Sequence, residues 1–324
     1  MKILIMLLLL VVCGASAQNN KPLRFDEQGE FKILQFTDTH VNIQKGQNLD
    51  IFPALQKIID TEKPDLVVLT GDIVTADDPQ EGFQHFEKVF KETGVPWVMV
   101  FGNHDSENNF SRKELADFLQ NRPMCLNADT GETDGNSNFV LPLSGKSDKT
   151  EALLYFMDSN AYSTLKPLVG GWGWFTHKQV DWYRKKSTGF TNENGGKTYP
   201  ALAFFHIPLP EYDLAWNNKK AVKFGKKRET VCCPEINTGM FAAMLECGDV
   251  MGTFVGHDHY NDYIVNYYDI ALAYGRASKT RNQKKPALGG RVIVLKEGKR
   301  QFDTWIREGT GKKFDECAFP DSFQ

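Results

Sequence analysis

Short apolar runs recur along the 324-residue chain, and segments with apolar residues every three or four positions separate the first of them. The runs predict buried β-strands, and the periodic segments predict amphipathic helices. In the N-terminal third we expect strands at 31–36, 66–69 and 95–101, with helices over about 49–61 and around 83–90 between them. This alternation is typical of sheet strands that are joined by crossover helices.

The rest of the chain continues with further helices and strands. Two capping boxes, Ser111 with Glu114 and Thr176 with Gln179, predict helix starts, and another helix is expected at 238–245. Further strands are expected at 139–143, 152–157, 201–205 and 250–255, and a late antiparallel set at 263–268, 270–274, 291–295 and 302–306.

Side chains that can bind metal ions follow five of these strands, at the point where each strand ends. Five of the seven histidines lie at these exits, whereas His85 and His177 are expected on helix surfaces. A single loop histidine is ordinarily solvated, but solvation gives no reason to place all five at strand exits. The set therefore predicts one site on a rigid scaffold. Its members are Asp38, His40, Asp72, Asn103, His104, His206, His257 and His259.

The number and type of these donors predict two metal ions. Seven side chains are available apart from His104, which is too many for one tetrahedral ion. One bridging carboxylate would give each of two ions four protein ligands. Carboxylate, amide and imidazole donors without thiolates suit zinc, manganese or iron. Two such ions with two carboxylates and a hydroxide keep a net positive charge, which favours an anionic phosphate ester as substrate.

His104 remains outside this ligand set. It lies in the loop Gly102-Asn103-His104-Asp105, which follows an apolar strand. Beside the leaving group of a bound ester its imidazole would donate a proton, with Asp105 orienting the ring and favouring its protonated form. We therefore expect His104 and Asp105 to be catalytic.

The first 17 residues have the pattern of a signal peptide. Lys2 is followed by an apolar segment at 3–12 and by small residues at 15–17. The apolar segment is too short to span a bilayer. A lipid anchor at Cys13 is the second interpretation. The sequence thus predicts a secreted or periplasmic, extracytoplasmic protein with no transmembrane segment and a single mature domain over 18–324.

Charge and cysteine content narrow the picture further. The net charge of −3 lacks the basic surplus of nucleic-acid binders, and the basic stretches at 219–228 and 279–285 are expected to be solvated loops. An oxidising compartment favours a disulfide between Cys232 or Cys233 and Cys247. Because five cysteines follow the leader, at least one thiol is unpaired or paired between chains. The remaining two are Cys125 and Cys317.

An aromatic, turn-rich segment at 160–176 either lines a cleft or packs over a sheet edge. Arg276 would hold a phosphate oxygen if it lies near the ions, although an arginine after a strand is more often solvated. The candidates for lining the cleft are Trp172, Trp174, Tyr274 and Arg276.

In order and type, these residues resemble the motifs of the calcineurin-like metallophosphoesterases. The pattern is Asp38-x-His40, Gly71-Asp72, Gly102-Asn103-His104-Asp105, His206 and Gly256-His257-x-His259. The stretch 239–262 and the ending from Gly275-Arg276 to Thr304-Trp305-Ile306 are similar to the purple-acid-phosphatase-like branch. That branch places an iron-binding tyrosine three residues after the aspartate of Gly-Asp. Thr75 occupies this position here, so a ferric-tyrosinate centre is not expected and the protein should be colourless.

The resemblance implies a four-layer α/β (α+β) sandwich, in which two facing mixed β-sheets are flanked by helices. It also implies two divalent or trivalent ions of manganese, iron or zinc, with Asp72 bridging them. The first ion would be held by Asp38, His40, Asp72 and His259, and the second by Asp72, Asn103, His206 and His257.

The function implied is that of a secreted, metal-dependent phosphoric ester hydrolase. A metal-bridging hydroxide would attack phosphorus in a small phosphate monoester, and His104 would protonate the leaving oxygen. Two alternatives stay open. One is cleavage of phosphodiesters or nucleotides at the same dinuclear site, and the other is a non-catalytic protein that binds metal or phosphate.

Overall fold

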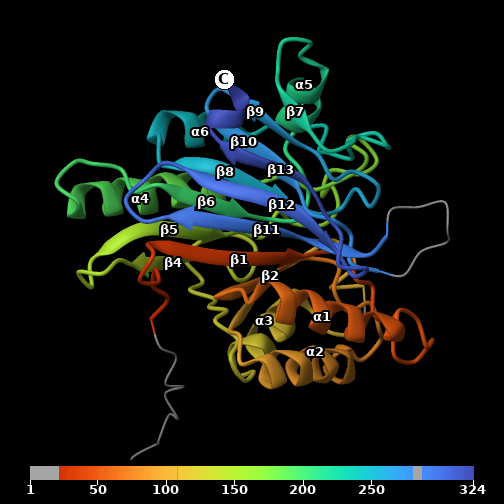
Figure 1. Ribbon diagram of the computed structural model, residues 1–324. Coiled ribbons are helices and arrows are strands. Elements are labelled where there is room, and N and C mark those ends of the chain that lie inside the picture. Colours follow the sequence, from red (N-terminus) through yellow and green to blue (C-terminus); the bar gives the residue numbers. More distant parts are fainter. Residues whose placement is uncertain (1–21, 108, 280–286) are drawn as a thin grey trace, which may run out of the picture.

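The computed structural model describes residues 22–107, 109–279 and 287–324. In these residues the strands form two stacked β-sheets (Figure 1), with the orders β13-β12-β11-β1-β2-β3 and β4-β5-β6-β8-β10-β9-β7. The strands are β1 (Glu30–Phe36), β2 (Leu66–Thr70), β3 (Trp97–Val100), β4 (Phe139–Ser144), β5 (Thr150–Phe156), β6 (Ala201–Phe204), β7 (Lys223–Phe224), β8 (Val250–Val255), β9 (Ile264–Tyr267), β10 (Ile270–Tyr274), β11 (Gly289–Lys296), β12 (Phe302–Glu308) and β13 (Lys313–Phe319).

Helices cover the two outer faces of this sheet pair. Those on the six-stranded sheet, in the lower part of Figure 1, are α1 (Phe52–Glu62), α2 (Pro79–Thr93) and α3 (Arg112–Gln120). Those on the seven-stranded sheet are α4 (His177–Glu193), α5 (Glu211–Asn217) and α6 (Met240–Cys247). Short 3-10 helices lie at Leu49–Ile51 and Asp321–Phe323. The prediction of two facing mixed sheets flanked by helices is confirmed.

Strand β2 shows why the apolar runs are continuous rather than alternating. Successive side chains of a strand point to opposite faces of the sheet. Leu66 and Val68 pack between the two sheets, and Val67 and Leu69 pack against α1–α3. All four are fully buried, because the sheet is covered on both faces.

Most of the predicted elements are present close to their predicted bounds, and both capping boxes are formed. The late strands, however, do not form one antiparallel set. Strands β9 and β10 join the seven-stranded sheet, where β10 pairs in parallel with β8, and β11 and β12 join the other sheet, where β11 pairs with β1. Local pattern predicts that a segment is a strand, but not which distant strand becomes its partner.

Helix α5, strands β7 and β13 and the 3-10 helix Asp321–Phe323 were not predicted. Helix α5 follows two prolines and has only seven residues, and β7 has two. Strand β13 is half-exposed at the sheet edge, so that it lacks the apolar alternation that marks the other strands.

The predicted disulfide is wrong, because all five described cysteines are free thiols. The backbone N–H of Cys232 donates to Asp258, just beyond the end of β8, whereas Cys247 lies just before β8 begins. A six-residue strand of about 20 Å separates the two places, which is too far for a disulfide.

No helix among the described residues is long and apolar enough to cross a membrane. The predicted signal peptide and Cys13 lie outside the described residues, as does most of the basic stretch 279–285. The signal peptide and the lipid anchor therefore stay predictions.

The parallel pairing of the central strands positions the predicted site. Strands β1, β2 and β3 are parallel in one sheet, and β5, β6, β8 and β10 are parallel in the other. The two sheets meet at this edge, where Thr37 after β1 forms a bridge with Ala277 after β10 and Gln35 Nε2 donates to the carbonyl of Val255. The loops that follow β1, β2, β3, β6 and β8 thereby converge.

Candidate dinuclear metal centre

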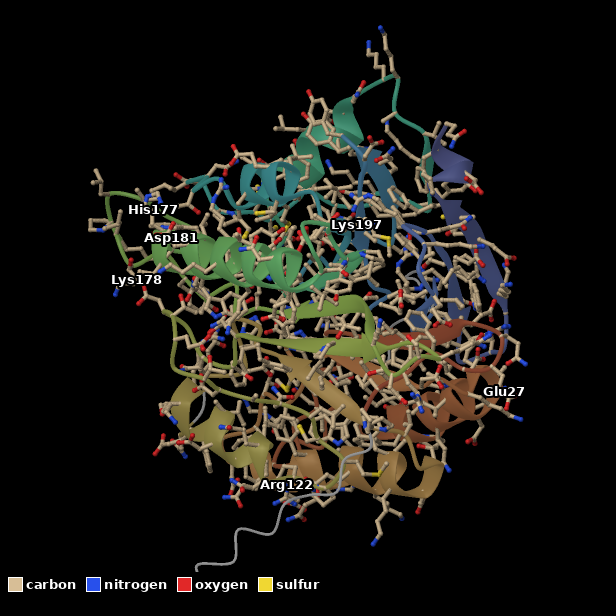
Figure 2. All side chains as sticks on the ribbon, turned by 90° about the vertical axis from the view of Figure 1, so that its left-hand side faces the viewer. Glu27, Arg122, His177, Lys178, Asp181 and Lys197 are labelled. Atoms are coloured by element: carbon tan, nitrogen blue, oxygen red, sulfur yellow. The ribbon has the colours of Figure 1, made fainter. Side chains whose placement is uncertain are left out.

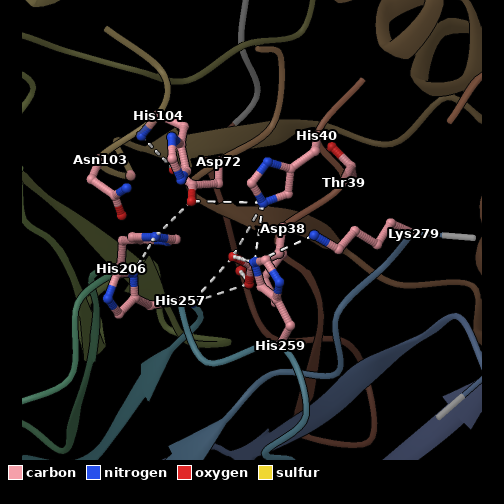
Figure 3. A network of polar contacts seen from close by, with 12 residues as sticks. Asp38, Thr39, His40, Asp72, Asn103, His104, His206, His257, His259 and Lys279 are labelled. Carbon is pink, nitrogen blue, oxygen red and sulfur yellow. Dashed lines mark hydrogen bonds and ion pairs between the residues drawn. The ribbon is translucent and has the colours of Figure 1, made fainter. Parts of the chain in front are cut away.

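Figure 3 shows the predicted site residues converging from these five loops. Two groups of carboxylates and imidazoles are each close enough to share one cation, with all donor atoms of a group within 4.8 Å of one another. The first group is Asp38, His40, Asp72 and His259, and the second is Asp72, His206 and His257. Asp72 belongs to both groups. The structure thus brings together the sets that the resemblance implied, and their role as ligands stays a prediction.

In the first group the imidazoles lie against carboxylates and against each other. His259 Nε2 lies 3.3 Å from Asp38 Oδ1 and 3.1 Å from His40 Nε2. His40 Nε2 lies 3.8 Å from Asp72 Oδ2. All these atoms point toward one position at the end of β1.

In the second group His206 Nε2 lies 3.3 Å from Asp72 Oδ2 and 3.3 Å from His257 Nδ1. Asn103 lies alongside, with its side chain directed at this group in Figure 3. Asn103 Oδ1 and His257 Nε2 are buried acceptor-capable atoms without a hydrogen-bond partner among the described residues. A buried polar atom without a partner is costly unless a ligand satisfies it. Asn103 Oδ1 therefore fits a second cation, which His257 would face with Nδ1, the nitrogen beside His206.

The backbone of the site is held in an uncommon conformation. Asp38, His40, Asp72 and His257 all have positive φ values, between 46° and 75°. Such left-handed backbone costs a non-glycine residue free energy, of order 1–3 kcal/mol each in strained cases, and it clusters at functional sites. Four of the seven predicted ligands share this feature. The fold therefore maintains the loop geometry at the expense of local backbone stability.

Glycines in the motifs allow the loops to approach one another. Gly71 has a φ of 84°, and a Cβ added there would lie 2.5 Å from the His206 ring. A Cβ on Gly256 would overlap the Thr37 hydroxyl next to Asp38. These two glycines are therefore required for the carboxylates and imidazoles to meet.

Contacts behind the predicted ligands fix their orientation. His206 Nδ1 lies 2.7 Å from the carbonyl oxygen of Thr70, which leaves Nε2 directed at the site. Asp38 accepts hydrogen bonds from the Thr37 hydroxyl and from the His257 backbone N–H. Such contacts hold the donor atoms in place before any ligand binds.

The charges of the site perturb its pKa values in opposite directions. Burial opposes protonation of His206, but the Asp72 and Asp38 carboxylates outweigh burial and raise its pKa to about 9. Burial lowers the pKa of His40 and of His257 to about 3. Despite burial, the neighbouring histidines hold the pKa of Asp72 well below its usual range. Ionised carboxylates beside imidazoles are the donor set that divalent transition metals prefer.

His104 lies beside this centre, with its ring centroid 5.4 Å from that of His40. Its expected partner was Asp105, but the structure differs. Asp105 is buried, and its carboxylate accepts from the backbone N–H groups of Asp72, Ile73 and Gly102. It ties the loop after β2 to the loop after β3. The carboxylate that contacts His104 Nδ1 belongs to Glu107 instead.

Of the four cleft-lining candidates, one borders the site and three do not. Trp172 lies edge-to-face against His257, with ring centroids 4.3 Å apart, so it borders the site. Arg276 is buried in ion pairs with Asp262 and Glu308 and is not available to a phosphate. Tyr274 is likewise buried, where its hydroxyl donates to Asp258. Trp174 lines small cavities beneath the aromatic segment rather than the metal centre.

Three further residues border the site and were not predicted to do so. Lys279 Nζ lies 3.4 Å from His259 Nε2, Glu107 contacts His104 within the loop after β3, and Tyr162 contacts Asn103 of the same loop. Tyr162 lies in the aromatic segment that the sequence singled out, which was a usable signal. The sequence gives no such signal for Glu107 and Lys279, because an acidic residue in a polar loop and a lysine in a basic run are ordinary. The histidines predicted to lie elsewhere do so, and His177 is exposed at the start of α4 (Figure 2).

Comparison with known proteins identifies the family. The family model of the calcineurin-like phosphoesterases matches residues 31–274. The chain belongs to this family. It is 32% identical to a protein named probable inactive purple acid phosphatase 29 from Arabidopsis thaliana, over 90% of this chain and 83% of that one. This relative confirms the resemblance to the purple-acid-phosphatase-like branch.

Two further relatives extend the comparison. Phosphatase DCR2 from Saccharomyces cerevisiae is 30% identical over 74% of this chain and 46% of its own length. The crystal structure of a dimetal phosphatase from Danio rerio superposes with a TM-score of 0.60 at 14% identity, covering 89% of this chain and 98% of that one. The second comparison shows the same fold. Family and geometry together show a phosphoesterase scaffold with a His/Asp cluster suited to two metal ions.

Proposed function

We propose that this chain is a metal-dependent phosphoesterase that hydrolyses small phosphate monoesters outside the cytoplasm. The observation that carries the proposal is the pair of donor groups that share Asp72, together with the partnerless buried atom Asn103 Oδ1 beside the second group. An inert loop cluster gives no reason for this oxygen to be left without a partner. The proposed extracytoplasmic location rests on the signal-peptide pattern of residues 1–17, before a single domain at 18–324.

The residues have separate tasks in this proposal. Asp38, His40, Asp72 and His259 would hold one ion, and Asp72, Asn103, His206 and His257 the other. Two ions at these positions would supply positive charge to the phosphoryl oxygens and acidify a water molecule. His104 Nε2–H donates its proton to the leaving oxygen, which then departs as a neutral alcohol. Asp105 acts through the backbone, by holding the loops of Asp72 and Asn103 together.

The substrate enters from the open side of the site. His104 and His259 are partly exposed there, and Lys279 adds a positive charge. We propose manganese, iron or zinc as the ions, because the donors are oxygen and imidazole nitrogen. Thr75 stands where a tyrosinate ligand to iron would be needed, so the protein should be colourless.

A second candidate function is a non-catalytic protein that binds metal or phosphate. The name of the Arabidopsis relative, which contains the word inactive, favours this candidate. Against it stands the presence here of all seven predicted ligands and of His104. A protein without catalysis needs neither a complete ligand set nor a proton donor beside it.

Metal analysis combined with hydrolysis assays separates the candidates. We expect the purified protein, loaded with manganese or zinc and then dialysed, to retain two ions and to hydrolyse p-nitrophenyl phosphate faster than bis(p-nitrophenyl) phosphate. The reverse preference would support the phosphodiesterase alternative. Two ions without hydrolysis of either ester would support the binding protein, and the absence of bound ions would contradict both functions.

Two histidine variants provide the matched comparison. His257→Asn should lose one ion and most activity, because it removes a proposed ligand. His177→Asn should keep both, because His177 lies on the exposed start of α4 (Figure 2).

A further inference from the structure

Glu107 and Tyr162 form a bridge between the proposed proton donor and a proposed metal ligand. Glu107 contacts His104 Nδ1 through Oε2, and its Oε1 accepts a hydrogen bond from the Tyr162 hydroxyl. The hydroxyl of Tyr162 in turn accepts a hydrogen bond of 3.2 Å from Asn103 Nδ2. His104 and Asn103 are neighbours in sequence, and the bridge joins their side chains through a residue 55 positions away from Glu107.

The donors and acceptors of this bridge allow only one arrangement. A carboxylate accepts and does not donate, so His104 must carry its proton on Nδ1, where it faces Glu107. The other ring nitrogen, Nε2, is therefore the atom left to exchange a proton with a substrate. At the other end, Asn103 uses Nδ2 to donate to Tyr162, which turns Oδ1 toward the second group, where it has no partner.

The aromatic segment holds Tyr162 in this position. Tyr162 stacks on Trp172 with ring centroids 5.4 Å apart, and a backbone bridge joins the two residues. Lys166 Nζ lies 4.8 Å from the Tyr162 ring centroid. Trp172 itself lies against His257. The Tyr162–Trp172 pair thus touches both His257 of the second group and the adjacent Asn103.

We propose that Glu107 and Tyr162 are positioning residues: Glu107 orients His104 for proton donation, and Tyr162 orients Asn103 toward the second cation. The part of the inference that concerns Glu107 and His104 rests on the proposed function. The part that concerns Tyr162 and Asn103 deals with metal binding alone. Neither residue belongs to the motifs by which the sequence resembles its family. The bridge would couple the occupancy of the second ion to the orientation of the acid.

Esters with different leaving groups test the role of Glu107. In Glu107→Gln the side chain keeps one oxygen acceptor, for which His104 Nδ1–H and the Tyr162 hydroxyl then compete. Alkyl alkoxides need a proton to leave, and p-nitrophenolate does not. We expect kcat on glycerol phosphate to fall about tenfold or more, with a change below about threefold on p-nitrophenyl phosphate and two ions still bound. A merely structural role would lower both rates equally.

Metal affinity tests the role of Tyr162 without any assay of activity. In Tyr162→Phe the buried amide of Asn103 loses its acceptor and is free to turn. Titration calorimetry with Zn²⁺ or Mn²⁺ should show one of the two ions binding about 10- to 100-fold more weakly, and the other unchanged. In Tyr162→His we expect the metal affinity to recover, because a ring nitrogen can accept from Asn103. Such a recovery would exclude a loss of folding as the cause.

Matched surface variants complete the test. Glu246→Gln removes an exposed ion pair with Arg184, and Tyr268→Phe alters an exposed ring at the β9–β10 turn, so both should behave as the parent does. Equal rate losses on both esters, or none, overturn the role of Glu107 while the proposed function stands. Unchanged affinity for both ions in Tyr162→Phe overturns the role of Tyr162. A parent that binds two ions without hydrolysis overturns the proposed function and the part that concerns Glu107 and His104, and calorimetry still decides the part that concerns Tyr162 and Asn103.

Discussion

The two donor groups differ in how firmly the protein holds them. In the first group the side chains of His40 and His259 are 16% and 28% exposed, and Lys279 lies beside them. In the second group Asp72 and His206 are buried, as is the adjacent Asn103, and only His257 is partly exposed. Contacts from behind hold donors in both groups: the Thr37 hydroxyl contacts Asp38 in the first, and the Thr70 carbonyl fixes His206 in the second, where Tyr162 also contacts the adjacent Asn103.

This difference indicates that the two neighbouring cation positions bind their ions with different strength. Donors that are buried and fixed by hydrogen bonds lose little entropy when an ion binds, so they favour tight binding and slow exchange. Donors on the open side admit solvent and substrate, which favours faster exchange. We therefore expect a firmly bound second ion and a more labile first ion, with Asp72 common to both.

The largest effect is expected from Asp72→Asn, which removes the one carboxylate that both groups share. The loss of a bridging charge should weaken both ions, and activity should fall by about a thousandfold or more. Elemental analysis and p-nitrophenyl phosphate hydrolysis measure the two effects. Retention of both ions would show that Asp72 does not join the groups.

Equivalent histidine variants in the two groups should separate their roles. His206→Asn should lose the second ion and also lower stability by roughly 1–3 kcal/mol, because it disturbs a buried contact with the Thr70 carbonyl. His259→Asn should lose the first ion with little change in stability, because its side chain is partly exposed. Chemical denaturation of both metal-free variants makes the comparison. Equal stabilities of the two variants would contradict the proposed difference in rigidity between the two donor groups.

Metal removal should proceed in two phases. A chelator reaches the first group through the open side, whereas the second ion is held mainly by buried donors. We expect one equivalent of metal to be released fast and one slowly, as followed with a colorimetric zinc indicator. A single phase that releases both equivalents together would contradict unequal positions.

A smaller effect is expected from pH, and it concerns the second group. Because the pKa of His206 is raised to about 9, its imidazole is protonated at neutral pH until a cation displaces the proton. The apparent affinity for the second ion should therefore increase about tenfold per pH unit up to about pH 9. Titrations in weakly buffered indicator solution should show one proton released. Affinity that is independent of pH would exclude this competition.

Much of the fold and most of the site can be predicted because both follow from local pattern. Apolar runs mark the strands, and the polar side chains that follow them are adjacent in sequence to the strand ends. Parallel pairing then brings these ends to one edge of the sandwich. His206 and Asp72, 134 positions apart, could be expected to meet for this reason.

The features that could not be predicted depend on contacts between distant segments. Glu107 contacts Tyr162 only because the aromatic segment folds over the loop after β3. Asp105 was expected to orient the neighbouring His104, but in the fold its carboxylate accepts from backbone N–H groups that no sequence pattern reveals. Arg276 likewise finds Asp262 and Glu308 rather than the site.

We propose that the five strand exits form two cation positions around Asp72. Crystals grown with Mn²⁺ test it most directly, through anomalous scattering. We expect two peaks about 3.5–4 Å apart with Asp72 between them, one beside His40 and His259 and the other beside Asn103 and His206. A single peak, or peaks away from Asp72, would contradict it.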